Sequence, residues 1–233
     1  MNKLLTAGLL LASVSANAGV GIENPFYRPS EGKFYSITDL NKSDDRLQAL
    51  ETFGYGFSNK FAMSFGFDLD RWSKNSGRDD GVGNWDLGAN YSALNRGGQL
   101  LDVLAHVGGA ISDDVSATGD TSVWGIGVRG GKVKDKYTYD GKITFDRLSA
   151  SGYHDSIIHF VLEGLYQFTP KFSGYLALDD EQHTQKGIDD SFWFVVQGNL
   201  VISANSAASV YYKTDIGNDD NDDVFGVKYG VQF

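Results

Sequence analysis

The last ten residues of the chain, 224–233, read VFGVKYGVQF and decide the fold. Apolar or aromatic side chains occupy every second position, namely Phe225, Val227, Tyr229, Val231 and Phe233. Successive side chains of a β-strand point to opposite faces, whereas those of a helix return to one face only after ~3.6 residues. The alternation therefore predicts a strand that is apolar and aromatic on one face.

The same alternation with a period of two residues runs through most of the preceding chain. Phe65 and Phe67, for example, alternate with Ser64 and Gly66, and no long amphipathic helical pattern follows residue 18. We predict strands at residues 31–39, 47–57, 61–72, 82–93, 99–111, 123–133, 136–148, 157–168, 172–180, 191–201, 207–215 and 223–233. The predicted fold class is all-β: a single antiparallel up-and-down transmembrane barrel of about 12 strands, with 10 or 14 as alternatives.

The predicted strands are joined by connections of two kinds that alternate along the chain. The short ones span residues 58–60, 95–98, 134–135, 169–171 and 202–206. The longer, polar ones span about 40–46, 73–81, 112–122, 149–156, 181–190 and 216–222. Short turns at one end and longer loops at the other are typical of transmembrane barrels, whose short turns lie in the periplasm. Strands of about ten residues also match the ~9–11 that cross a bilayer when tilted.

The composition of the two faces indicates which one meets lipid. The apolar face is rich in Phe, Tyr and Trp, whereas the other face is mostly Gly, Ser, Asn, Asp and Thr. Aromatic residues also gather near strand ends, where their amphipathic rings would lie at the membrane interfaces. At the long-loop end we expect the interface aromatics Trp72, Trp85, Trp124 and Trp193. A soluble secreted barrel or sandwich is the alternative.

The C-terminal strand, with Phe225, Val227, Tyr229, Val231 and a final Phe233 on one face, resembles the signature strand of bacterial outer-membrane β-barrel proteins. It departs from the family's usual motif in one place, because Lys228 stands where a glycine is common. The resemblance implies a porin-like barrel in the bacterial outer membrane, with lipid bilayer and lipopolysaccharide around it. It also implies recognition of this strand, as an assembly signal, by the barrel-assembly machinery. No motif identifies a closer family.

The overall composition excludes several classes of protein. The 233 residues include 20 Lys and Arg against 30 Asp and Glu, which gives a formal net charge of −10. Nucleic-acid binding needs a concentrated basic surface, so nucleic acid is not an expected partner. The chain has no cysteine, which excludes disulfides and thiolate metal sites.

The N-terminal part divides into two segments before the barrel. Residues 1–18 carry one cation, an apolar stretch and the ending Ala-Asn-Ala, which predicts a signal peptide that is cleaved after Ala18. Residues 19–30 contain Pro25 and Pro29 and cannot form a central strand. This segment is either periplasmic or a plug in the lumen, and the transmembrane barrel occupies 31–233.

The polar face of the strands predicts the lining of a pore. If this face points inward, it contributes Asp68, Asp86, Asp102, Asp140, Glu163, Arg129 and Lys142. Fixed carboxylates raise the local concentration of cations. We therefore expect a porin-like channel for passive passage of ions or small solutes, with a mild cation preference. We expect no catalytic residue, cofactor or metal, and the oligomeric state stays open.

Two alternatives from other classes of function remain. A barrel-embedded hydrolase acting on lipid would need a histidine base, and His106 and His159 lie on the polar face. No Gly-x-Ser-x-Gly or His-Glu-x-x-His motif accompanies them. A structural or adhesive barrel would act through its loops, of which residues 215–223, DIGNDDNDD, are the most acidic.

Overall fold

A computed structural model describes residues 24–74, 76–116, 120–185, 190–217 and 223–233. The predicted signal peptide, 1–18, lies outside the described residues, as do 19–23. The described residues contain no helix that is long and apolar enough to cross a membrane.

The described chain forms twelve strands. They are β1 (Phe34–Lys42), β2 (Arg46–Gly56), β3 (Phe61–Trp72), β4 (Gly81–Arg96), β5 (Gln99–Ala110), β6 (Ser122–Lys134), β7 (Tyr137–Ala150), β8 (Tyr153–Thr169), β9 (Phe172–His183), β10 (Ser191–Ser203), β11 (Ser206–Asp215) and β12 (Asp223–Gln232). The predicted all-β class and strand number are confirmed.

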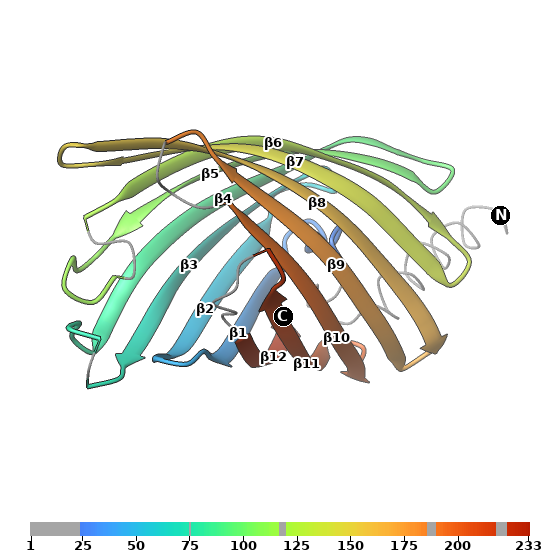
Figure 1. The fold of residues 1–233 in the computed structure, drawn as a ribbon. Coiled ribbons are helices and arrows are strands. Elements are labelled where there is room, and N and C mark those ends of the chain that lie inside the picture. The colour runs from blue at the N-terminus through green and yellow to red at the C-terminus, as the bar shows by residue number, and fades with distance from the viewer. Residues whose placement is uncertain (1–23, 75, 117–119, 186–189, 218–222) are drawn as a thin grey trace, which may run out of the picture.

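The strands pair with their sequence neighbours in antiparallel fashion, and β1 pairs with β12 to close the barrel (Figure 1). In the closing pair, Asp39 of β1 lies opposite Lys228 of β12. Closure leaves no strand edge unpaired, which is the requirement for a sheet surrounded by lipid.

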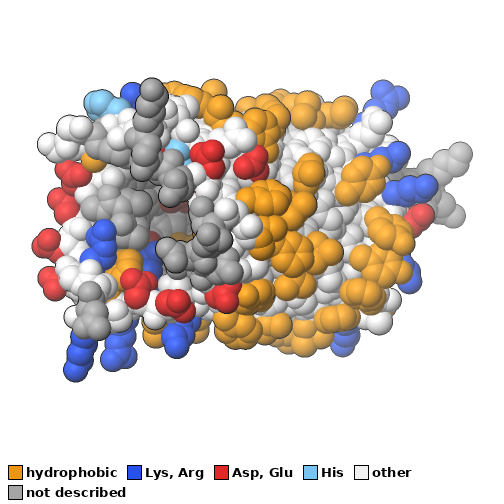
Figure 2. All heavy atoms as spheres, viewed as in Figure 1, with side chains coloured by type: hydrophobic (Ala, Val, Ile, Leu, Met, Phe, Trp, Pro, Cys, Tyr) orange, Lys and Arg blue, Asp and Glu red, His pale blue; other side chains and the backbone are white. Residues whose placement is uncertain are grey.

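The outer wall of the barrel is apolar. Phe225 and Tyr229 of β12 and the following Phe233 are exposed, and every strand contributes exposed aromatic or aliphatic side chains. Figure 2 shows these hydrophobic side chains spread over the wall, with acidic side chains gathered toward the long-loop end at the left. The largest fully buried side chains are instead polar, and Asp102 and Asn199 among them point inward. This inside-out arrangement is the one that lipid-exposed barrels require.

Two expected loops are much shorter than predicted. The 149–156 connection is wrong, because β7 and β8 continue as a long hairpin closed by residues 151–152 alone. Gly152 adopts a positive φ of 77° there, a conformation that suits glycine at a tight turn. The 40–46 connection likewise shrinks to residues 43–45. In both places, polar residues that predict a loop are paired with the neighbouring strand instead.

Residues 24–33 precede β1 and make a separate contact with the short-turn end of β2. Glu31 forms a parallel bridge with Gly56, and the Gly32 amide donates to the Gly56 carbonyl at 2.8 Å. A side chain at Gly56 would collide with the backbone carbonyls of Pro29 and Ser30. The glycine thus allows the N-terminal segment to turn at the short-turn end of the barrel.

Candidate functional site

The inner wall is built from polar side chains and from glycines that make room for them. The Tyr35 ring lies over Gly54 of the next strand, and the Tyr211 ring lies over Gly226. The Tyr211 hydroxyl thereby reaches past β12 and donates to Asp39 of β1 at 3.0 Å. These glycines therefore let long side chains cross a neighbouring strand.

The described part of the N-terminal segment lies against the inner wall. Arg28 Nη1 donates to Asp102 Oδ1 of β5 at 2.6 Å, and it lies 3.5 Å from Asn90 Oδ1 of β4. The Asp102 side chain is 0% exposed and that of Arg28 is 9% exposed. This ion pair, removed from bulk water, holds the segment inside the barrel.

Two aromatic residues add to this attachment. The Phe26 ring is buried, and the Arg129 guanidinium lies 5.4 Å from its centroid. The Tyr27 hydroxyl donates to Gln232 Oε1 of β12 at 2.6 Å. Burial raises the pKa of the Tyr27 phenol, with a further contribution from Tyr35, so the hydroxyl keeps the proton that it donates. The segment thus contacts both sides of the lumen.

Cavities remain on both sides of the segment. One of about 370 Å³ is lined by Asn24 and Pro25 together with luminal residues of β6 and β8–β12. Another of about 240 Å³ is lined by residues 27–29 and by strands β1 and β3–β6. Arg129 lines both. The described segment therefore divides the lumen without filling it.

Five of the seven residues predicted to line a pore are brought together near the segment. Asp102, Arg129 and Lys142 are successive partners across β5, β6 and β7. Asp140 lies directly opposite Glu163 in the adjoining row. Directly opposite Cβ atoms lie ~4.5–5.5 Å apart, so these acids and bases form one mixed cluster.

Asp68 and Asp86 lie apart from this cluster, toward the long-loop end. Asp68 is buried and accepts hydrogen bonds from the Gln48 and Asn84 side chains at 3.0 Å each, and Arg46 lies 3.3 Å away. Asp86 also points inward, and its side chain is exposed to the lumen. All seven predicted residues thus lie on the inner wall, but Asp68 is held within a network of its own.

The structure also joins histidines with carboxylates of other strands. His106 Nε2 lies 3.5 Å from Asp146, and His159 bridges Asp146 at 3.4 Å and Asp179 at 3.5 Å. Gly125 lies between His106 and Asp146, and a Cβ there would collide with both side chains. Spacing along one strand could not show this cross-strand chain. Among the described residues, no group of His, Asp or Glu is arranged to hold a metal ion.

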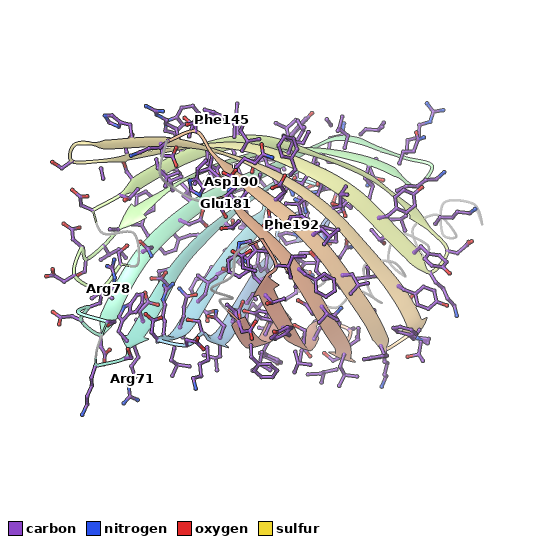
Figure 3. The ribbon with its side chains drawn as sticks, in the orientation of Figure 1. Arg71, Arg78, Phe145, Glu181, Asp190 and Phe192 are labelled. Atoms are coloured by element: carbon purple, nitrogen blue, oxygen red, sulfur yellow. The ribbon has the colours of Figure 1, made fainter. Side chains whose placement is uncertain are left out.

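Two of the four predicted interface tryptophans are placed differently. Trp72 points inward and donates through Nε1 to the Val115 carbonyl at 2.9 Å, and its ring centroid lies 5.1 Å from Arg46 Cζ and 5.4 Å from Arg78 Cζ. Figure 3 shows Arg78 at the long-loop end of the barrel. Trp193 also points inward, 4.0 Å from Lys213 Nζ. Both tryptophans occupy the alternating positions that belong to the inward, polar face. The prediction that they lie at the membrane interface is therefore wrong for both.

The other two tryptophans face outward as expected. Trp124 is exposed and lies beside Phe145, with ring centroids 6.0 Å apart. Phe145 projects from the wall in Figure 3. Trp85 shares its face with the exposed Leu87.

An acidic side chain that was not expected on the outer wall lies in the middle of a strand. Glu51, halfway along β2, shares the lipid-facing side with Leu47 and Phe53. Its carboxylate accepts hydrogen bonds from Ser36 at 2.5 Å and from Thr38 at 2.6 Å, both on β1. In the sequence, Glu51 takes a place on the apolar side of the alternating pattern, and this break in the pattern indicates an acidic group on the outer wall. Ionisable groups facing lipid are costly and rare, and here two hydroxyls offset part of that cost.

No family model matches this chain, and no curated protein matches it in sequence. The structural comparison finds an outer membrane channel, COG4313, from Pseudomonas putida F1, with 14% identity and a TM-score of 0.67. That match covers 90% of this chain and 98% of the other. The NanC porin matches with 9% identity and a TM-score of 0.66, over 85% and 98% of the two chains. The KdgM porin matches with 12% identity and a TM-score of 0.59, over 84% and 98%.

These likenesses span almost the whole length of each solved barrel at low sequence identity, so what they show is the fold. The neighbours are outer-membrane channels and porins, in agreement with the expected location in the bacterial outer membrane. The closed twelve-stranded wall and its inverted polarity lead to the same conclusion. The chain has the fold of bacterial outer-membrane β-barrel proteins.

Proposed function

We propose that this protein is a narrow, porin-like channel that lets ions or small solutes pass the outer membrane. The observation that carries the proposal is the charged inner wall with cavities on both sides of the N-terminal segment. Twelve strands enclose more space than the side-chain-filled barrels of eight strands and less than the open porins of sixteen. The channel and porin names of the structural neighbours support it.

The proposal includes a constriction in which the described part of the N-terminal segment, residues 24–30, acts as a luminal plug. The described part is attached by the Arg28–Asp102 pair and narrows the lumen from the short-turn side. Solutes would pass through the cavities beside it, which suits small, hydrated species.

A mild cation preference is the finer part of the proposal. Carboxylates such as Asp86, Asp140 and Glu163 are spread along the inner wall and favour cations. The larger cavity opposes this preference locally, because Arg129, Lys213 and Lys228 face it together with only one acid, Glu163. We therefore propose weak rather than strong selectivity.

Planar-bilayer recording of single channels tests the proposal. We expect discrete conductance steps in the intact protein and steps several times larger in a variant that lacks residues 19–30. Reversal potentials in a KCl gradient should indicate a small excess of cation current. Absence of steps in both proteins would refute the channel, and clear anion selectivity would refute the charge assignment.

The lipid-hydrolase alternative receives less support from the geometry. His106 and His159 project into the lumen, each beside a carboxylate of another strand, and lipid contacts the opposite face. Release of fatty acid from labelled phospholipid, lost in His106→Ala or His159→Ala, would revive it. The adhesive alternative rests on loop 215–223, of which 218–222 lie outside the described residues.

The expected assembly signal is also part of the proposal. Phe225, Val227, Tyr229, Val231 and Phe233 share the outward face of β12, where the assembly machinery could read them before the barrel closes. Phe233→Ala should lower the amount of barrel assembled in cells, while the purified protein still refolds in detergent. Unchanged assembly in cells would contradict this role. Lipopolysaccharide is the expected lipid neighbour at the long-loop end.

A further inference from the structure

A groove of about 460 Å³ lies on the outer wall over β7–β10, near the short-turn end. Gly164 and Gly174 form part of its lining, between the side chains of Tyr139, Tyr166 and Leu176. A Cβ added at Gly164 would meet nothing within 4 Å. The groove is therefore an open depression in the outer wall.

The groove has the apolar lining that suits an acyl chain. Almost all of its surface is apolar, and Leu176 and Val196 face lipid beside it. At its short-turn end the Tyr166 ring contacts those of Tyr137 and Phe168, with centroids 4.8 and 4.9 Å apart. Such aromatic rows mark the level of lipid headgroups. The groove thus starts at the interface and runs into the hydrocarbon.

Two lysines lie beside this aromatic row on the same outer face. Lys132 of β6 is the register partner of Tyr139, and Lys134 is the partner of Tyr137. Both lysines lie on the outward face of β6, as Trp124 does, and they are the outward residues nearest the short-turn end of this strand. Among the described residues, no acidic side chain forms an ion pair with either lysine. Their ammonium groups are available to a phosphate at the interface.

We infer that this groove binds an anionic phospholipid from the membrane leaflet at the short-turn end. One acyl chain lies over Gly164 and Gly174, and Lys132 and Lys134 bind the phosphodiester. The charge of the lysines and the apolar lining beside them select this occupant over a neutral lipid. The inference rests on the membrane location alone and holds whether or not the barrel conducts.

Native mass spectrometry of the full-length protein in detergent tests the inference. The protein is titrated with phosphatidylglycerol and with phosphatidylcholine that has the same acyl chains. We expect one phosphatidylglycerol to bind preferentially. Each lysine near an anionic lipid surface contributes about a fivefold gain in affinity, so Lys132→Ala with Lys134→Ala should remove most of the preference. Lys60→Ala, at another exposed short turn, is the matched control.

Gly164→Leu tests the groove itself, because its side chain would fill open space and leave the barrel intact. Binding of both lipids should be lost, while Gly141→Leu, at an outward glycine outside the groove, should leave binding unchanged. Heat-modifiable migration in gels verifies that each variant is folded. Unchanged phosphatidylglycerol binding in Gly164→Leu, or equal binding of the two lipids by the intact protein, would overturn the inference. A protein dimer that Gly164→Leu abolishes, in place of a lipid adduct, would also overturn it.

Discussion

Asp102 and Glu51 present the same chemical problem on opposite faces of the barrel wall. Asp102 points into the lumen and its side chain is fully shielded, whereas Glu51 points outward halfway along β2. Each carboxylate is removed from bulk water, and each therefore needs partners from the protein. The partners differ in kind and in distance along the chain.

Asp102 forms an ion pair with a cation that lies 74 residues away in the chain, whereas Glu51 accepts hydrogen bonds from two hydroxyls that lie 13 and 15 residues away. The inner pair therefore attaches a separate segment of chain, and its loss should change what the lumen contains. The outer group ties adjacent strands together, and its loss should change only the stability of the wall. The difference indicates that position on the wall, more than charge, decides the role of a carboxylate here.

Breaking the inner pair should have the largest effect. Asp102→Ala leaves the Arg28 guanidinium without its partner, and an uncompensated buried charge costs about 3–5 kcal/mol. The segment should therefore leave the lumen, and single-channel conductance should rise to that of the variant lacking residues 19–30. Arg28→Ala should give the same conductance, and Arg71→Ala, at the exposed end of β3, should leave it unchanged. An unaltered conductance in Asp102→Ala would contradict this role.

Breaking the outer group should lower stability without opening the pore. Ser36→Ala with Thr38→Val removes both donors to Glu51, and hydrogen bonds to charged groups contribute about 1.5–3 kcal/mol each. We expect the free energy of unfolding in lipid vesicles, measured by urea titration, to fall by about 3 kcal/mol. Conductance should match that of the intact protein. A larger pore in this variant would remove the distinction between the two sites.

Removing the carboxylate as well sharpens the comparison. Glu51→Leu added to Ser36→Ala and Thr38→Val leaves no polar group on this part of the wall. Replacing both partners by apolar groups can be nearly neutral, so stability should return to within about 1 kcal/mol of the intact protein. The triple variant and its double parent are compared in the same urea titration. Failure to recover would mean that the hydroxyls act through something other than Glu51.

The smallest effect is expected from cations that face the water of the larger cavity. Lys213→Gln with Lys228→Gln should shift the reversal potential in a KCl gradient by a few millivolts toward cation selectivity. Lys42→Gln is the control substitution, because Lys42 is exposed at the long-loop end of β1. A shift toward anions would show that these lysines do not line the path of the ions.

The fold was predictable because strand periodicity is local. The twelve predicted strands differ from the observed ones by a few residues at most ends, and the expected pore-lining residues all lie on the inner wall. The 149–156 loop was wrong because polar residues at the ends of β7 and β8 extend beyond the apolar wall while still pairing. The prediction that Trp72 and Trp193 lie at the membrane interface followed from residue type alone. The alternating pattern of their own strands places both on the inward face.

The alternation of side chains and the composition of the two faces predicted by themselves a barrel with an aromatic outer wall and a polar interior, because adjacent residues of a strand must face opposite sides. The alternation also assigned the five expected pore-lining carboxylates to the inner face. Only the tertiary structure decided which groups meet: Arg28 with Asp102, and His106 with Asp146 across Gly125. These contacts depend on the register between strands and on closure of the barrel. Both are set by pairing between distant residues, which no local pattern contains.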